Sequence, residues 1–113
     1  MSDELTGVEA ELRSNAISVE RLDVGETVEL TYTTAFPGES VNHGEMGRAL
    51  STFIDLFEAD RLDPRRVEGT VLRSDEDVQG TWYAETEWFE ELAAYSISEE
   101  EFSARVLDTL EEP

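Results

Sequence analysis

Hydrophobic and polar residues recur along this chain with two different periods, and the change of period predicts its helices and strands. Leu5, Val8 and Leu12 follow the spacing of one helix face, so we expect a short amphipathic helix over residues 4–13. Apolar residues then fall at every second position on either side of a turn at residues 23–26. This pattern predicts a β-hairpin with one buried face, formed by Ile17, Val19, Val28, Leu30 and Tyr32.

A longer helix is predicted over residues 44–60. Asn42 is placed to cap its first turn, and Glu45, three residues on, is expected to complete a capping box. Pro64 prevents a simple continuation of this helix. Its inward stripe consists of Met46, Leu50, Phe53, Ile54 and Phe57.

A second hairpin follows, because residues 67–73 and 80–85 are rich in strand-forming residues and flank an acidic turn at residues 74–78. Two helices then end the chain. The first is expected over residues 87–95, with Trp88, Leu92 and Tyr95 on its inner face. The second begins with a capping box formed by Ser98 and Glu101. Its inward stripe consists of Phe102, Val106 and Leu110.

The predicted order is therefore α-ββ-α-ββ-α-α, within a single small domain over residues 1–113. Runs of strands separated by helices are typical of the α+β class. Because the connections are short, we expect an antiparallel sheet of about four strands with helices packed mainly on one face.

The charge of the chain indicates the environment in which the protein works. Twenty-eight acidic residues stand against eight basic ones, all of them arginine, which gives a net charge of -20. Such a surface stays soluble at molar salt, where self-repulsion is screened, so we expect a halophilic protein with hydrated cations at its surface. An ordinary acidic protein from a GC-rich genome is the alternative.

Several classes of partner and location are disfavoured by the same composition. The strong negative charge argues against nucleic acids and anionic membranes as partners. The acidic amino terminus has no signal-peptide pattern, and no stretch is apolar enough to span a membrane. We therefore expect a cytoplasmic protein.

Candidate catalytic and metal chemistry is sparse. The chain has no cysteine, and its one histidine, His43, is expected to be exposed at the start of a helix. Residues 75–80 resemble the opening of a calcium loop, but Thr86 stands where the closing glutamate belongs, so we interpret them as a hairpin turn. We expect no catalytic residue, no metal site and no cofactor.

Three of the eight arginines, Arg61, Arg65 and Arg66, lie within six residues. Guanidinium groups bind phosphate or carboxylate through paired donors, so this cluster is a candidate anion site. Alternatively, the three arginines neutralise the carboxyl end of the preceding helix and pair with neighbouring acids. The sequence leaves both interpretations open.

Aromatic residues give the other candidate binding surface. Trp82 and Tyr83 are neighbours on a strand, so they point to opposite faces of the sheet, and Phe89 lies off the expected inner face of its helix. Exposed aromatic side chains are typical of binding hot spots, which indicates a dimer or peptide-binding patch. Helices on both faces of the sheet would instead bury them all.

The segments at residues 69–71 (Gly-Thr-Val), 80–82 (Gly-Thr-Trp) and 97–102 (Ile-Ser-Glu-Glu-Glu-Phe) resemble small, acidic, lysine-free proteins encoded in haloarchaeal genomes. This resemblance covers most of the chain and implies no particular activity. The layout of elements also resembles type III secretion chaperones and related α+β dimers, which implies a peptide-binding homodimer. Residues 35–43 lack the additional strand of that layout.

Two functional hypotheses follow. The first is a protein-binding or adaptor domain without enzymatic activity, which pairs with itself or with another protein through its aromatic residues. The second is a domain that binds, or acts on, a small anionic ligand through Arg61, Arg65 and Arg66.

Overall fold

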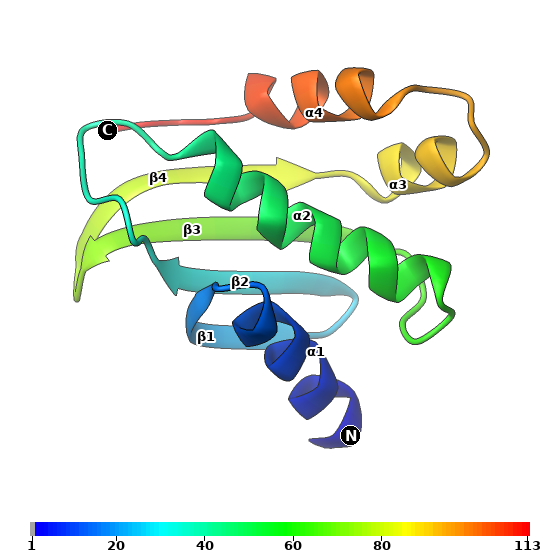
Figure 1. Ribbon diagram of the computed structural model, residues 1–113, viewed down its shortest axis with the longest axis horizontal. Coiled ribbons are helices and arrows are strands. Elements are labelled where there is room, and N and C mark those ends of the chain that lie inside the picture. Colours follow the sequence, from blue (N-terminus) through cyan, green and yellow to red (C-terminus); the bar gives the residue numbers. More distant parts are fainter. Residues whose placement is uncertain (1) are drawn as a thin grey trace.

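The computed structural model describes residues 2–113, and it confirms the α+β class and the α-ββ-α-ββ-α-α order (Figure 1). Leu5, predicted on the inner face of the first helix, lies outside the residues whose side chains are described. The elements are α1 (Ser2–Ser14), β1 (Ser18–Val24), β2 (Thr27–Thr33), α2 (His43–Glu58), β3 (Arg66–Ser74), β4 (Asp77–Ala84), α3 (Thr86–Ala93) and α4 (Glu99–Asp108).

The four strands form one sheet in the order β1-β2-β3-β4. Each hairpin is antiparallel as expected, but the central pair, β2 and β3, is parallel. The reason is α2, whose 16 residues return the chain along the sheet, so β3 starts at the same end as β2. Short connections alone do not predict this crossover, so the expected fully antiparallel sheet is wrong at this pair.

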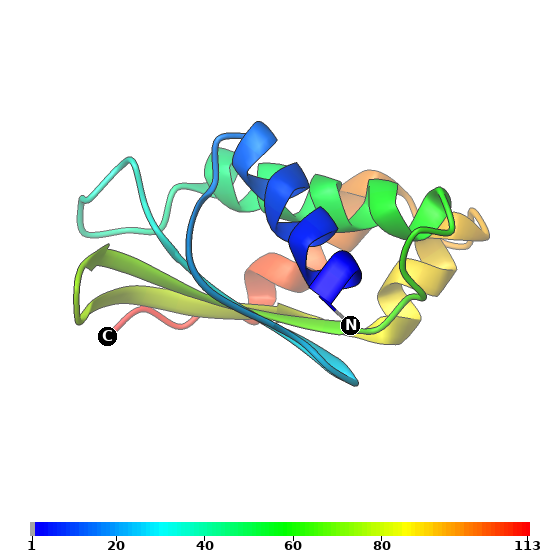
Figure 2. The same cartoon turned by 90° about the horizontal axis from the view of Figure 1, so that it is seen from below.

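The helices are packed on one side of the sheet, and the other side is uncovered (Figure 2). The inner face of β2 consists of Val28, Leu30 and Tyr32, all buried. The buried side of α2 packs on this face, as the apolar patterns of the strand and the helix predict. The buried apolar residues of α2 include Met46, Leu50, Phe53, Leu56 and Phe57.

At position 69 only glycine leaves room for the side chain that packs against the strand. Gly69 is paired across β3 and β4 with Trp82, whose ring lies over its Cα atom. A Cβ atom at this position would lie 2.3 Å from Cε2 of Trp82, well inside van der Waals contact. The indole is therefore buried against bare backbone.

The connection between β2 and α2 is fixed by a buried carboxylate. Asn42 caps α2 as predicted, accepting a hydrogen bond from the Glu45 amide at 2.8 Å. The Glu45 side chain does not return to the cap, so only half of the predicted capping box forms. Its two oxygens instead accept hydrogen bonds from the Thr34 hydroxyl and from the Ala35 amide, the latter at 2.9 Å.

The inner face predicted for α3 is right for Trp88 and Leu92, which pack partly buried against the core, but wrong for Tyr95. Phe89 is its buried side chain, packing edge-on against Phe57 with ring centroids 4.8 Å apart and against Phe102 at 5.1 Å. Tyr95 is 93% exposed. The helix ends at Ala93 and Tyr95 has a φ of 61°, so the chain has turned away before that residue.

Both edges of the sheet carry irregular features. At the β4 edge, the segment after α4 runs alongside the strand, where Thr81 and Glu111 exchange two backbone hydrogen bonds of 2.9 Å. The Thr109 hydroxyl accepts a further bond from the Tyr83 amide. At the other edge, β1 contains an irregularity of register between Val19 and Arg21.

Candidate functional site

On the uncovered side of the sheet, β2, β3 and β4 carry few charged side chains, whereas the edge strand β1 presents Glu20, Arg21 and Asp23 beside them. We call the outward side chains of β2, β3 and β4 the open face. Among its eleven residues are only two carboxylates and one guanidinium, although the whole chain has a net charge of -20. The open face consists of Thr27, Glu29, Thr31, Thr33, Arg66, Glu68, Thr70, Leu72, Val78, Thr81 and Tyr83.

One half of the open face has no charged side chain at all. The strand register places its residues in two rows across the sheet, one of three threonines and one of a threonine with two aliphatic residues. All six are partly accessible to solvent. We call this set the uncharged patch: Thr31, Thr70 and Thr81 in the first row, and Thr33, Leu72 and Val78 in the second.

An arginine and two aromatic rings stack beside the uncharged patch. The guanidinium of Arg66 lies 4.1 Å from the centre of the Tyr83 ring, and Tyr83 stacks on Trp88 with centroids 6.0 Å apart. Arg66 also pairs with Glu68 and Glu85, each at 2.8 Å. The hydrogen bond to Glu68 is the main cause that raises the pKa of Arg66 above its ordinary value.

A hollow of about 260 Å³ lies between this stack and the C-terminal segment. Thr70 and Thr81, which are paired across β3 and β4, line it with their short side chains. Tyr83 and Glu111 stand at its sides. The open face therefore has a ridge of stacked rings next to a hollow, which is lined by threonine hydroxyl groups and by the charged side chains of Arg66, Glu68 and Glu111.

The structure does not place the three predicted aromatic residues on one surface. Trp82 and Phe89 belong to the hydrophobic core, and the indole nitrogen of Trp82 donates a hydrogen bond to Tyr32 at 3.3 Å. Tyr83 alone of the three reaches the uncovered side, where it meets Arg66. The prediction that Trp82 and Tyr83 point to opposite faces is confirmed, and the exposed position predicted for Phe89 is wrong.

The three clustered arginines are not brought together. Arg61 lies 3.9 Å from Glu11, and Arg65 donates to the backbone carbonyl oxygens of Gly25 and Asp63. The partners of Arg66 are the two carboxylates described above. The three guanidinium groups thus share no partner, and in this arrangement they form no common anion site.

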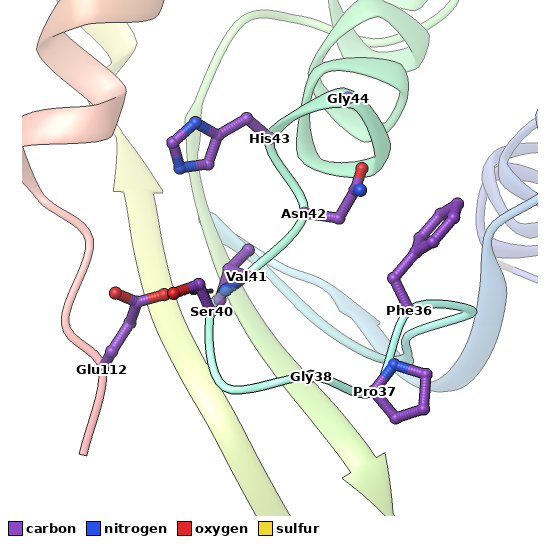
Figure 3. Close-up of a pocket in the computed structure, with 9 residues that line it drawn as sticks. All are labelled: Phe36, Pro37, Gly38, Ser40, Val41, Asn42, His43, Gly44 and Glu112. Carbon is purple, nitrogen blue, oxygen red and sulfur yellow. Dashed lines mark hydrogen bonds between the residues drawn. The ribbon is translucent and has the colours of Figure 1, made fainter.

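His43 lies in a shallow depression of about 1000 Å³ with Ser40 and Glu112 at its wall (Figure 3). It is the first residue of α2 and is exposed, as predicted. Glu112 reaches the loop from the C-terminal segment and accepts a hydrogen bond from the Val41 amide at 2.7 Å. No hydrogen bond joins His43 to Ser40 or Glu112 among these described residues, so they are not arranged as a nucleophile with its base.

The calcium-like segment is a turn between strands. Asp75 and Glu76 form the two-residue connection from β3 to β4, and Asp77 pairs with Arg73 at 3.0 Å. Within the part of the chain that the structure describes, no group of three or more histidine, aspartate or glutamate side chains is placed to hold a metal ion.

The sequence interpretation missed the uncharged patch and Trp88 as parts of one surface. A signal was present: outward positions of the strands carry threonine at residues 27, 31, 33, 70 and 81, whereas outward positions of the helices carry glutamate. Trp88 was assigned to the inner face of α3. It packs partly buried against the core and also stacks on Tyr83, at the end of β4.

Comparison with known proteins gives a family without a described activity. Neither the curated proteins nor the solved structures contain a match to this chain. Within residues 2–113, no helix is long and apolar enough to cross a membrane. The model of a domain of unknown function, DUF8159, matches residues 1–113, so the chain belongs to this family.

Proposed function

We propose that this chain is a protein-binding domain of a halophilic cytoplasm that pairs with a second copy of itself through the open face. The observation that carries the proposal is the uncharged patch. On a molecule with a net charge of -20, six adjoining surface residues without a charge form a distinct area, bordered on β1 by Glu20 and Arg21.

The cost of desolvation determines which surfaces a partner can cover. Burying a carboxylate in an interface is expensive unless it is paired, whereas threonine hydroxyls lose little when they find new hydrogen-bond partners. The ion pair between Arg66 and Glu68 lowers the cost further, because these two charges already compensate one another. The uncharged patch is therefore the part of the open face that the protein can cover without burying an unpaired acid, whereas Glu29 has to stay solvated.

A second copy suits this surface because like patches meet about a two-fold axis. Pairing threonine and aliphatic rows with their own copies keeps the acidic helices of the two molecules on opposite outer sides. A face of three strands with about seven residues each covers roughly 300 Å² per molecule. Stable interfaces bury roughly 800 Å² per partner, so we expect a weak dimer whose population depends on concentration.

Sedimentation equilibrium in molar KCl, up to millimolar protein, tests this proposal. We expect the average mass to rise toward that of a dimer, and Thr70→Glu to abolish the rise by placing a carboxylate in the middle of the open face. Ser96→Glu adds the same charge at an exposed position between α3 and α4 and should leave the dimer intact. Circular dichroism establishes that both variants are folded. A strict monomer at every concentration, or equal behaviour of the two variants, contradicts the proposal.

The halophilic part of the proposal rests on composition. The chain has no lysine, and its helices expose glutamates that hold hydrated cations at high salt. Measuring stability against salt concentration tests this part separately from the dimer.

A further inference from the structure

A groove runs along α2 on the side facing α3 and α4. It consists of three adjoining hollows of about 290, 230 and 50 Å³. Gly47, Leu50 and Ser103 line both the first and the second, and Ile54 and Leu92 line both the second and the third. The hollows are thus continuous, and they follow α2 over most of its 16 residues, which is roughly 20 Å.

The floor of the groove is apolar and its α2 wall is low. Ile54, Leu92 and Leu107 are only partly buried although they pack against the core. At Gly47, a Cβ atom would meet no other atom within 4 Å. Ser103 adds a second small side chain on the opposite wall. Large apolar side chains from a partner therefore have both a surface to contact and room to enter.

The charged groups at the groove all have the same sign. Asp55, Glu58 and Glu99 line its middle section, and none of the residues lining the three hollows is an arginine. Arg105, on α4, is turned to Glu91 at 2.8 Å. A helix of a second copy is disfavoured as the occupant, because the exposed faces of these helices carry mainly glutamate, and a basic partner is favoured.

The walls also determine the conformation of the occupant. An extended peptide gains affinity by pairing its backbone with an exposed strand, but α2, α3 and α4 offer no unpaired row of backbone groups. A helix satisfies its own backbone hydrogen bonds and presents apolar residues along one side. A groove of roughly 20 Å accommodates about four helical turns.

We propose that this groove binds an amphipathic helix of another protein, with apolar residues at positions i, i+3 or i+4 and i+7 and with arginine or lysine beside them. The apolar residues enter the hollows along α2, and the basic residues face Asp55, Glu58 and Glu99. This inference is independent of the open face, which lies on the other side of the sheet.

A display library of four-turn amphipathic helices, half of them arginine-flanked and half glutamate-flanked, tests the groove against the full chain in molar KCl. We expect arginine-flanked peptides to be enriched. Their affinity, measured by fluorescence anisotropy, should fall about tenfold or more with Gly47→Phe, which fills the groove. The control Ala104→Phe adds the same ring at an exposed position of α4 that does not line the groove, and should have little effect.

Three results would overturn the inference: a library without binders, enrichment of glutamate-flanked peptides, or equal binding by the Gly47→Phe and Ala104→Phe variants. Circular dichroism must first show that both variants fold. Binding that survives Gly47→Phe but is lost with Thr70→Glu would assign the peptide to the open face instead. Failure of the groove and failure of the dimer are therefore separate outcomes.

Discussion

The indole nitrogen of Trp82 donates a hydrogen bond of 3.3 Å to the phenolic oxygen of Tyr32, although the two residues are 50 positions apart in the chain. Both side chains are almost completely buried between the sheet and the helices. Burial is the main cause that raises the pKa of Tyr32 far above its ordinary value. The folded protein therefore keeps this phenol protonated at pH values where an unfolded chain ionises it.

This difference predicts the alkaline limit of stability. Below about pH 10 the phenol is protonated in both states, and above it only the unfolded chain ionises, so the free energy of unfolding should fall by up to about 1.4 kcal/mol per pH unit. Without lysine or cysteine, few other groups titrate in this range. Urea unfolding between pH 8 and 12 measures the slope, which should be shallower for Tyr32→Phe. An identical slope for both proteins contradicts the assignment.

Gly69→Ala should destabilise the fold by about 2 kcal/mol or more. The added methyl group meets the Trp82 ring at 2.3 Å, and neither the strand backbone nor the buried indole can move freely. Thr70→Ala, on the next residue but on the open face, should cost less than about 1 kcal/mol. Chemical denaturation at fixed KCl compares them, and equal losses would mean that the indole moves aside.

Glu45→Gln should cost about 2 kcal/mol, because an amide cannot accept the hydrogen bonds from both Thr34 and Ala35 in the way a carboxylate does. The loop over residues 35–41 should then be cleaved faster by a protease. Glu39→Gln removes an exposed carboxylate from the same loop and serves as the control. Similar cleavage rates for both variants would show that Glu45 does not hold the loop.

Thermal stability should fall as KCl is lowered from molar to millimolar concentrations, since repulsion among the acids is then unscreened. Replacing Glu87, Glu90 and Glu100 together by glutamine removes three exposed charges and should make this dependence shallower. Melting curves over a KCl series measure both effects. A melting temperature that does not change with KCl contradicts the halophilic proposal.

Periodicity was sufficient for most of the fold because each strand buries one face and each long helix one stripe. It failed at α3, where eight residues are too few to define a face and Phe89, rather than Tyr95, turns inward. It also left the central strand pairing open. Whether β2 and β3 run parallel depends on the end of the sheet at which the chain leaves α2, and periodicity along the sequence does not contain this information.

The candidate site was predictable only in part. Arg66 and Tyr83 were both named from the sequence, but their contact arises from strand pairing, in which Glu68 lies opposite Tyr83 and Arg66 two positions before it. Phe36 is 47% exposed in the loop after β2 and was not among the candidates. Neighbouring arginines such as Arg61 and Arg65 are separated by the turn that precedes β3, so closeness in sequence overstated their closeness in space.

The irregular edges of the sheet have a consequence for aggregation. An exposed, regular edge strand is a template for fibril growth, but here the segment around Glu111 covers β4, and the bulge after Val19 interrupts β1 next to the charged residues Glu20 and Arg21. Strand-by-strand propagation is therefore blocked at both ends. The folded sheet is thereby protected against lengthening sideways by the addition of further strands.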